Sequence, residues 1–328
     1  MTKTAVVILN YNGEDHLKKF LPSVLEHSKQ AEIIVADNKS ADTSLAFLKD
    51  NFAEIRTITL NDNYGFAGGY NEALKEVEAD YFVLLNSDVE VTSDWLEPLV
   101  QFLDSNPEYA ACQPKVKDFS NKEQFEYAGA AGGFIDSLGY PYCRGRVFDT
   151  IEEDHGQYDQ PSDIFWSTGA CMIIRSKVYR ELGGLDADFF AHMEEIDLCW
   201  RIQSAGYKIK AIPSSVVYHL GGGTLSKLNP FKTYLNFRNG LQMLIKNLPL
   251  IHLILKVPLR VLLDWLAALK FLLEGHGKHF ISVLKAHMNV TFKIRSIIKK
   301  RHVVSKPNNR KVLVVEYYLK GRKRFSRL

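Results

Sequence analysis

The fold class of this 328-residue chain is decided by the stretch Tyr81-Phe-Val-Leu-Leu-Asn-Ser-Asp-Val-Glu-Val91. Its first five residues are all apolar or aromatic, which is the pattern of a strand buried on both faces of a parallel sheet. The run then ends abruptly at Asn86-Ser87-Asp88. Polar residues at the carboxyl end of such a strand lie where open α/β sheets bind ligands. A carboxylate there can hold a divalent cation and, through it, a diphosphate, although Asn-Ser-Asp alone is also a common polar turn.

Similar strands precede this stretch, and helical segments separate them. Residues 5–9, 32–37 and 55–60 are largely apolar runs that each end in polar residues. Residues 14–27 carry apolar side chains at helical spacing. This alternation predicts an α/β protein with a doubly wound, mostly parallel central sheet flanked by helices.

A glycine-rich loop, Asn63-Tyr-Gly-Phe-Ala-Gly-Gly-Tyr-Asn71, follows the third strand and opens a helix. Its glycines allow backbone N–H groups to approach a phosphate at the helix N-terminus, and a simple turn is the alternative. The loop matches neither the dinucleotide-binding nor the Walker pattern, so neither type of site is supported. Asp37-Asn38 ends the second strand, where nucleotide folds accept hydrogen bonds from a base or ribose; a capping turn is the alternative.

A second acidic centre begins at Glu194. Glu194 and Asp197 share a helix face, and Asp197 and Arg201 are four residues apart and can pair. Glu195, near the helix start, could act as general base toward a sugar hydroxyl, or the acids only stabilise the helix N-terminus. His219 precedes three glycines and could bind a metal or a diphosphate, although a lone histidine is more often structural.

The C-terminal part differs from the rest in charge and hydrophobicity. The formal net charge is +3, yet Glu316 is the only acidic residue between Gly277 and Leu328, which suggests a polyanionic partner. Residues 235–273 are strongly apolar but contain too many charges for a membrane span. They predict helices lying in a membrane interface, while packing on the catalytic domain or a homodimer interface stays open. We therefore divide the chain into a domain of residues 1–240 and an appendage of residues 241–328.

The remaining composition indicates the compartment. The cysteines lie far apart and suggest neither a zinc site nor a disulfide framework, so a reducing cytosol is expected. The N-terminus lacks the apolar core and cleavage site of a secretion signal. A cytoplasmic protein that is peripheral on the inner face of the cell membrane fits these features. The cysteines are Cys112, Cys143, Cys171 and Cys199.

In this order, the motifs resemble the family 2 glycosyltransferases of the GT-A fold, in the rhamnosyltransferase-like branch. Each motif is weak alone, but seven in one order are specific, and the resemblance covers roughly residues 3 to 240. The matching pieces are Val6-Val-Ile-Leu-Asn-Tyr-Asn-Gly13, Val35-Ala-Asp-Asn-Lys-Ser-Ala-Asp42, the glycine-rich loop, Leu84-Leu-Asn-Ser-Asp-Val89, Gly169-Ala-Cys-Met-Ile-Ile-Arg175, Glu194-Glu-Ile-Asp-Leu-Cys-Trp-Arg201 and His219.

The resemblance implies a nucleotide-sugar across the strand ends and a divalent metal, Mg²⁺ or Mn²⁺, at an Asp-x-Asp-type motif. Here that motif lacks its first carboxylate, so Asp88 carries most of the metal contact, with His219 near the diphosphate as a second metal residue. The usual Glu-Asp pair reads Glu194-Glu195, so Glu195 takes the place of the base, with Glu194 and Asp197 as alternatives. The implied donor contacts are Asn10, Asn12, Asp37, Asn38, Asn63, Gly65, Gly68, Gly69, Asn71, Asn86, Ser87 and Arg201.

The implied function is an inverting transfer of a sugar, with rhamnose hinted at by the glycine-rich loop, from a dTDP- or UDP-linked donor. The acceptor is a saccharide or a lipid-linked saccharide in cell-surface polysaccharide synthesis. One alternative is a sugar nucleotidyltransferase, but the expected basic loop after the first strand is absent from Asn10-Tyr-Asn-Gly-Glu14. Another is a non-catalytic membrane-associated scaffold, and nucleic-acid binding through the basic tail is the least favoured.

Overall fold

The computed structural model describes residues 2–221, 229–301 and 311–328. Two parts of the sequence predictions lie outside these ranges. They are Gly222, Gly223 and Thr224 in the glycine run after His219, and residues 302–310 of the predicted basic tail.

The central sheet of the described residues is built from β1 (Thr4–Asn10), β2 (Glu32–Asp37), β3 (Arg56–Thr59), β4 (Tyr81–Asn86), β5 (Val89–Val91), β6 (Tyr109–Asp118), β11 (Ser162–Asp163), β12 (Cys171–Arg175) and β13 (Lys208–His219). The strand order is β11-β13-β6-β12-β4-β1-β2-β3, and β5 pairs with β13. Strands β1 to β4 are parallel, and β13 is parallel to β6. Strand β12 runs antiparallel to both β4 and β6. The predicted parallel arrangement is confirmed for β1 to β4, whereas β5, β11 and β12 run antiparallel to their neighbours, so the sheet as a whole is mixed.

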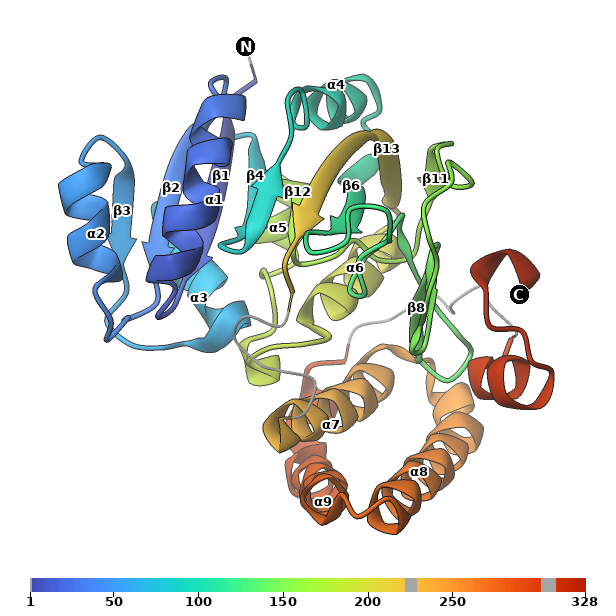
Figure 1. Cartoon of the computed structure of the whole chain (residues 1–328). Helices are drawn as coiled ribbons and strands as arrows, with labels where there is room; N and C mark the ends of the chain where they lie inside the picture. The colour runs from blue at the N-terminus through green and yellow to red at the C-terminus, as the bar shows by residue number, and fades with distance from the viewer. Residues whose placement is uncertain (1, 222–228, 302–310) are drawn as a thin grey trace.

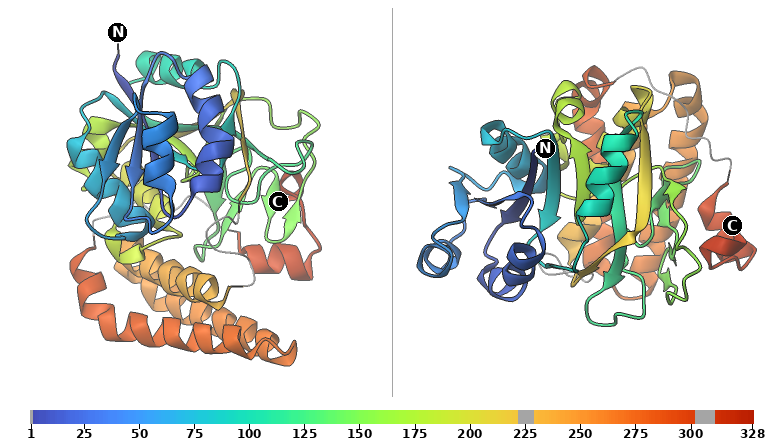
Figure 2. Two further views of the ribbon diagram at one scale, coloured as in Figure 1. Left: turned by 60° about the vertical axis from the view of Figure 1, so that its left-hand side comes forward. Right: turned by 90° about the horizontal axis from the view of Figure 1, so that it is seen from above.

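Helices cover both faces of the sheet, as predicted for a doubly wound fold (Figures 1 and 2). The alternation along β1 shows why: Val6 and Ile8 enter the core under α1, α2 and α4, while Ala5 and Val7 enter the core under α3 and α6. Both faces are thus buried. The elements outside the C-terminal region are α1 (Glu14–His27), α2 (Ser44–Asn51), α3 (Gly65–Ala73), η1 (Leu74–Glu76), α4 (Glu97–Ser105), α5 (Ser176–Glu181), η2 (Ala187–Phe189) and α6 (Glu194–Ser204).

Between β6 and β12 the chain leaves the central sheet. It forms a small antiparallel sheet of β7 (Gly133–Ile135), β8 (Pro141–Cys143), β9 (Arg146–Val147) and β10 (Thr150–Ile151). The C-terminal segment, with short helical turns at Val315–Leu319 and Phe325–Arg327, packs against this sheet through Leu313 and Tyr317 (Figure 1).

Three long helices form the C-terminal region: α7 (Pro230–Asn247), α8 (Leu250–Leu273) and α9 (Gly277–Lys299). They lie together at one end of the molecule (Figure 1). Helix α7 runs across the predicted domain boundary at residue 240 and packs on α6. Within the described ranges, none of the helices has the length and apolarity to cross a membrane.

Helix α8 buries an arginine and an aspartate on its inner side. Its buried residues are Arg260, Asp264 and Ala268, while Leu255 is 74% exposed. The Arg260 guanidinium stacks 3.8 Å from the centroid of the Tyr140 ring and donates to the Asp264 carboxylate at 2.8 Å. Arg260 also donates to the Leu138 carbonyl at 3.1 Å, and Leu253, Val257 and Val261 pack against buried apolar residues. Polar and apolar contacts together therefore attach α8 to the protein, while its most exposed leucines face outward.

Candidate active site

The carboxyl ends of β1, β2 and β4 bring three predicted donor residues together. Asn10 pairs with Asp37 across the parallel ladder, and Leu9 pairs with Asn86. The Asn10 amide donates to the buried Asp37 carboxylate at 2.9 Å. Asn10 Oδ1 has no hydrogen-bond partner among the described residues. The sheet register therefore places an amide and a carboxylate at one edge, where a ligand can bind.

Two further asparagines join the neighbouring loops to this edge. Asn12 Oδ1 accepts from the backbone N–H of Ala41 at 2.7 Å. The Asn38 amide donates to Asn63 Oδ1 at 3.1 Å and to the Gly65 carbonyl at 3.0 Å. These side chains fix the loops after β1, β2 and β3 relative to one another.

Ser87 lies beside the first loop. A Cβ added to Gly13 would stand 2.5 Å from Asn10 Oδ1 and 3.6 Å from Ser87 Oγ. The absence of a side chain at Gly13 therefore lets the loop after β1 pass close to the polar end of β4.

The glycine-rich loop packs differently from the prediction. The N–H groups of Phe66 and Ala67 donate to the Phe190 carbonyl at 2.7 and 3.1 Å, so these two amides are engaged within the protein. Gly65 has φ +69°, and a Cβ there would stand 2.5 Å from the Phe190 ring. A Cβ at Gly69 would meet Leu9 at 2.9 Å. The glycines thus permit close packing of α3 on β1 and on the chain around Phe190.

Gly68 and Asn71 also face protein. A Cβ added to Gly68 would stand 2.8 Å from the Cβ of Tyr64. Asn71 Oδ1 accepts from the Tyr179 hydroxyl at 2.7 Å, and its amide donates to the Leu185 carbonyl at 2.6 Å. The structure places both residues in packing contacts of α3 rather than at the strand ends.

The second part of the site is a buried charge cluster after β4. His219 Nε2 lies 3.1 Å from Asp88 Oδ1, and His219 Nδ1 lies 3.4 Å from Glu126 Oε1. Burial opposes the charge on the imidazole, but Glu126 and Asp88 raise the pKa of His219 to about 10. Burial likewise opposes ionisation of Asp88, yet His219 lowers its pKa. The Asn86 amide lies 3.4 Å from His219 Nε2.

Glu126 was not identified from the sequence. It lies in the excursion between β6 and β12, where no motif or period distinguishes one acid from another. Strand β13 returns His219 to this point, next to Val89 in the ladder with β5. The contact joins positions 126 and 219, so only the three-dimensional fold reveals it.

Asp88 and His219 offer an oxygen and a nitrogen to a divalent cation. The described residues contain no cluster of three or more His, Cys, Asp or Glu side chains with metal-binding geometry. A two-residue set fits a cation that also takes substrate phosphate oxygens and water. The raised pKa of His219 means that a metal ion binding at this imidazole would have to displace its proton.

The third part is the acidic start of α6. Burial raises the pKa of Glu195 to about 7. Burial and the Glu195 carboxylate together raise the pKa of Glu194 well above its ordinary value. The Oε2 atoms of both residues have no hydrogen-bond partner within the described ranges. Both carboxyls therefore bind a proton more tightly than an exposed glutamate does.

Gly169 connects this pair to the rest of the site. A Cβ added to Gly169 would stand 3.2 Å from the Phe66 ring and 3.9 Å from Glu195 Cβ. The next residue, Ala170, accepts a backbone hydrogen bond from Asn86 at 3.0 Å. Glu195, the glycine-rich loop and the end of β4 therefore converge on one point.

Asp197 was predicted to be catalytic and Arg201 to bind the donor, but the structure places both side chains in the protein interior. They pair at 2.9 Å, as their spacing predicted, but Asp197 is fully buried. Its carboxylate also accepts from Lys246 at 2.9 Å and from Asn247 at 2.7 Å, both on α7. The Nη1 and Nη2 atoms of Arg201 donate hydrogen bonds to the carbonyls of Leu182 and Gly184. The structure places both residues in an interior network that joins α6 to α7.

The sequence matches a family model for glycosyl transferase family 2 over residues 5–183, which is more than half of the chain. The chain belongs to this family. Relatives of this chain include an N-acetylglucosaminyl-diphospho-decaprenol L-rhamnosyltransferase of Mycobacterium tuberculosis (strain CDC 1551 / Oshkosh). It is 23% identical over 231 residues, with 65% of this chain and 75% of the relative covered. Rhamnosyltransferase WbbL of Escherichia coli (strain K12) is 24% identical over 221 residues, with 65% and 82% covered.

Two solved structures resemble this family 2 chain in fold. GalNAc-T7 with UDP, GalNAc and Mn²⁺ gives a TM-score of 0.60 at 18% identity, with 75% of this chain and 49% of that chain covered, so this chain spans about half its length. The Pyrobaculum calidifontis mannosyltransferase PcManGT with GDP-Man and Mn²⁺ gives 0.54 at 14% identity, with 89% and 75% covered. The fold is GT-A, with a C-terminal helical region.

Removing Lys246 from the buried network around Asp197 should strongly destabilise the protein. In Lys246→Met, Asp197 and Asp186 lose a buried cation at 2.9 and 2.6 Å, so the free energy of unfolding should fall by about 3 kcal/mol. Urea denaturation measures it. Lys270→Met is the matched control because its pair with Glu274, at 3.7 Å, is exposed, and a change below about 1 kcal/mol is expected. Equal effects of the two substitutions would contradict the structural role of the network.

Proposed function

We propose that this family 2 protein is an inverting glycosyltransferase. It moves a sugar, with rhamnose favoured, from a dTDP- or UDP-linked donor to a saccharide or lipid-linked saccharide acceptor in cell-surface polysaccharide synthesis. The observation that carries the proposal is the convergence of Asp37, the Asp88–His219 pair and Glu195 on one edge of the sheet. Two relatives are named as rhamnosyltransferases, which supports a rhamnosyl donor, and the name of one of them includes a lipid-linked saccharide.

In this proposal the donor lies across the strand ends. Asp37 and Asn10 contact the base and ribose, since they form the amide–carboxylate pair at the edge. The diphosphate lies near Asp88 and His219. These two residues would hold Mg²⁺ or Mn²⁺, which supplies Lewis-acid neutralisation of charge on the leaving diphosphate. The structures of GalNAc-T7 and of the mannosyltransferase PcManGT, both with Mn²⁺, support this choice of ion.

Glu195 is the proposed general base. Its carboxylate takes the proton of the acceptor hydroxyl while the hydroxyl oxygen attacks the anomeric carbon from the face opposite the diphosphate. The new glycosidic bond forms as the bond to the diphosphate oxygen breaks, so the configuration inverts. Burial suits Glu195 to this task because a base with a pKa of about 7 accepts protons efficiently at neutral pH.

The first test separates donor binding from turnover. Thermal stabilisation by a panel of nucleotide-sugars with Mn²⁺ identifies the donor, and nucleotide release in the presence of acceptor measures turnover. Glu195→Gln should keep the stabilisation and lose about 10²-fold or more in kcat, because the amide cannot accept the proton. Glu181→Gln, an exposed change on α5, should leave both unchanged. Full activity of Glu195→Gln would overturn the base assignment, and no donor response would favour a scaffold.

The second test uses pH. The raised pKa of Glu195 means that the carboxyl is protonated, and inactive as a base, below about pH 7. We therefore expect kcat/KM to rise with pH through about 7 and to be lost as the pH falls below it. The rise of kcat/KM near pH 7, the acidic limb of the profile, should be absent from the residual activity of Glu195→Gln. A profile that is flat between pH 5 and 8 would contradict the proposed role.

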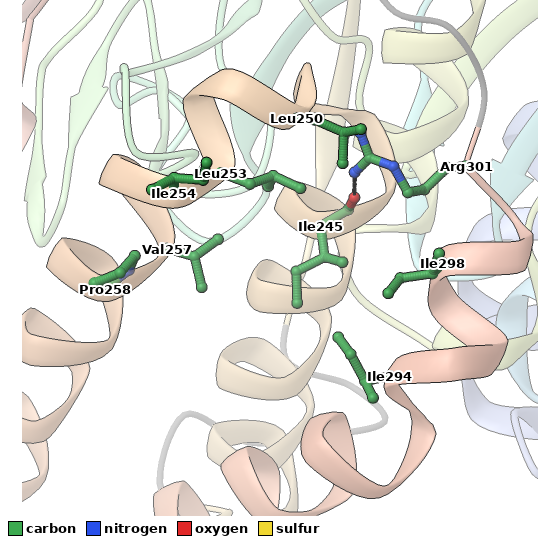
Figure 3. Close-up of a pocket in the computed structure, with 9 residues that line it drawn as sticks. All are labelled: Ile245, Leu250, Leu253, Ile254, Val257, Pro258, Ile294, Ile298 and Arg301. Carbon is green, nitrogen blue, oxygen red and sulfur yellow. Dashed lines mark hydrogen bonds between the residues drawn. The ribbon is translucent and has the colours of Figure 1, made fainter.

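We further propose a peripheral position on the cytoplasmic face of the membrane, through α8. Its exposed apolar side adjoins an open apolar groove of about 610 Å³ between α7, α8 and α9, lined by residues that include Leu253 and Ile294 (Figure 3). Exposed Lys293 and Arg295 on α9 add positive charge next to it. Apolar surface beside basic residues is the combination that binds anionic lipid surfaces.

Vesicle sedimentation of the full chain tests this attachment. Replacing three exposed residues of α8 by Glu (Leu255, Leu262 and Leu266) should weaken binding to phosphatidylglycerol-containing vesicles at least tenfold. The matched control adds the same charge at Asn51, Gln101 and Ser105, which are exposed on α2 and α4, and should bind as the unchanged protein does. Absence of vesicle binding together with dimers in light scattering would instead assign the apolar side to a second copy of the chain.

A further inference from the structure

The chain immediately before the proposed base has an unusual backbone. Phe190, His192 and Met193 have φ of +64°, +69° and +73°, in the left-handed region that non-glycine residues avoid. Met193 is the residue from which α6 begins, and Glu195 follows in the first turn. Such conformations persist only where neighbouring structure holds them, and they are common at functional sites.

Helix α7 supplies the contacts that hold this segment. The side-chain amide nitrogen of Asn239 lies within hydrogen-bond distance of three backbone carbonyls in this loop. They are those of Phe189 at 3.0 Å, Ala191 at 2.8 Å and His192 at 2.7 Å. Asn239 is fully buried, so no water competes for these carbonyls. The Asn239 side chain thus provides hydrogen-bond donors for loop carbonyls that are not paired within a helix or strand.

Arg238 completes the arrangement. Its Nε donates to Asn239 Oδ1 at 2.7 Å, which orients the amide so that its NH₂ group faces the loop. Its Nη2 donates to the carbonyls of Asp188 at 3.0 Å and Phe189 at 2.7 Å. The two neighbouring side chains together contact the segment from residue 188 to residue 192.

The same segment contacts the glycine-rich loop on its other side. The Phe190 carbonyl accepts from the N–H groups of Phe66 and Ala67, and the Phe190 ring occupies the space that a Cβ on Gly65 would need. Phe66 in turn packs near Gly169, which also adjoins Glu195. The segment therefore lies between α7, the donor-side loop and the start of α6.

We propose that Asn239 and Arg238 are positioning residues of the transfer reaction, which act by fixing residues 188–193 and thereby the direction of Glu195. The inference rests on the proposed function of Glu195 as base. Neither residue reaches the reacting atoms; each sets where the carboxylate and the glycine-rich loop stand relative to each other. The C-terminal helical region is thus part of the catalytic apparatus rather than only an attachment device.

Asn239→Ala tests the proposal in the full chain. We expect kcat to fall about 10- to 100-fold, because a displaced base loses the alignment that the reaction needs. The donor KM and the donor-induced thermal stabilisation should change less than threefold. The matched control is Asn236→Ala, which removes the same side chain from a half-exposed position one turn earlier on α7 and should leave kcat unchanged.

A rescue experiment distinguishes positioning from general destabilisation. Glycine adopts φ near +73° without strain, so Met193→Gly should restore much of the kcat lost in Asn239→Ala. The pH limb near 7 should also shift in Asn239→Ala, because the surroundings of the Glu195 carboxyl change, and return toward its original position in the double variant. A merely structural role would lower stability without moving this limb.

A third variant keeps the test decisive if Asn239→Ala does not fold. Arg238→Lys preserves the charge but offers one nitrogen in place of the guanidinium fork, so the same selective loss of kcat is expected. Unchanged kcat in Asn239→Ala or in a folded Arg238→Lys, with Glu195→Gln inactive, would overturn the positioning proposal alone. An active Glu195→Gln would instead show that the proposed function of Glu195 is wrong.

Discussion

The buried carboxylate of Asp197 is the contact on which the arrangement of the helices depends. It accepts hydrogen bonds from Arg201 on its own helix and from Lys246 and Asn247 on α7. Burial favours the neutral acid, but Arg201 and Lys246 lower the pKa of Asp197, so the group is charged and fully paired. A buried ion pair adds little net stability over apolar packing, but it tolerates few alternative geometries. The network therefore fixes where α7 crosses α6, and with it where Asn239 meets the chain that precedes Glu195.

Much of the fold could be predicted because it is encoded locally. The continuous apolar runs from Ala5 to Leu9 and from Tyr81 to Leu85 contain the information for a sheet buried on both faces. The polar ends of the strands could be grouped at one edge because parallel strands share a direction. The reversal of β12 could not be predicted in this way, since a buried strand has the same apolar pattern in either direction.

The candidate site was predictable only where its residues lie in the recognised motifs. Asp88, His219 and Glu195 belong to such motifs, and the structure brings them to the same region. Glu126 and Asn239 do not, because their contacts join segments about 50 or more residues apart. The phosphate-binding expectation for the glycine-rich loop depended on free amides, and the Phe190 carbonyl, more than 120 positions later, occupies two of them.

The inward-facing polar side of α8 has a consequence for how the protein tolerates its surroundings. Arg260 and Asp264 attach the helix to Leu138 and Tyr140 through hydrogen bonds and a ring contact, so the outer leucines contribute little to holding it in place. The free energy gained by covering those leucines is then separate from the free energy that stabilises the fold. A bilayer, a detergent belt or a second copy of the chain could each cover the exposed leucines without changing the helix itself. Loss of that covering surface would lower the solubility of the protein before it changed the fold.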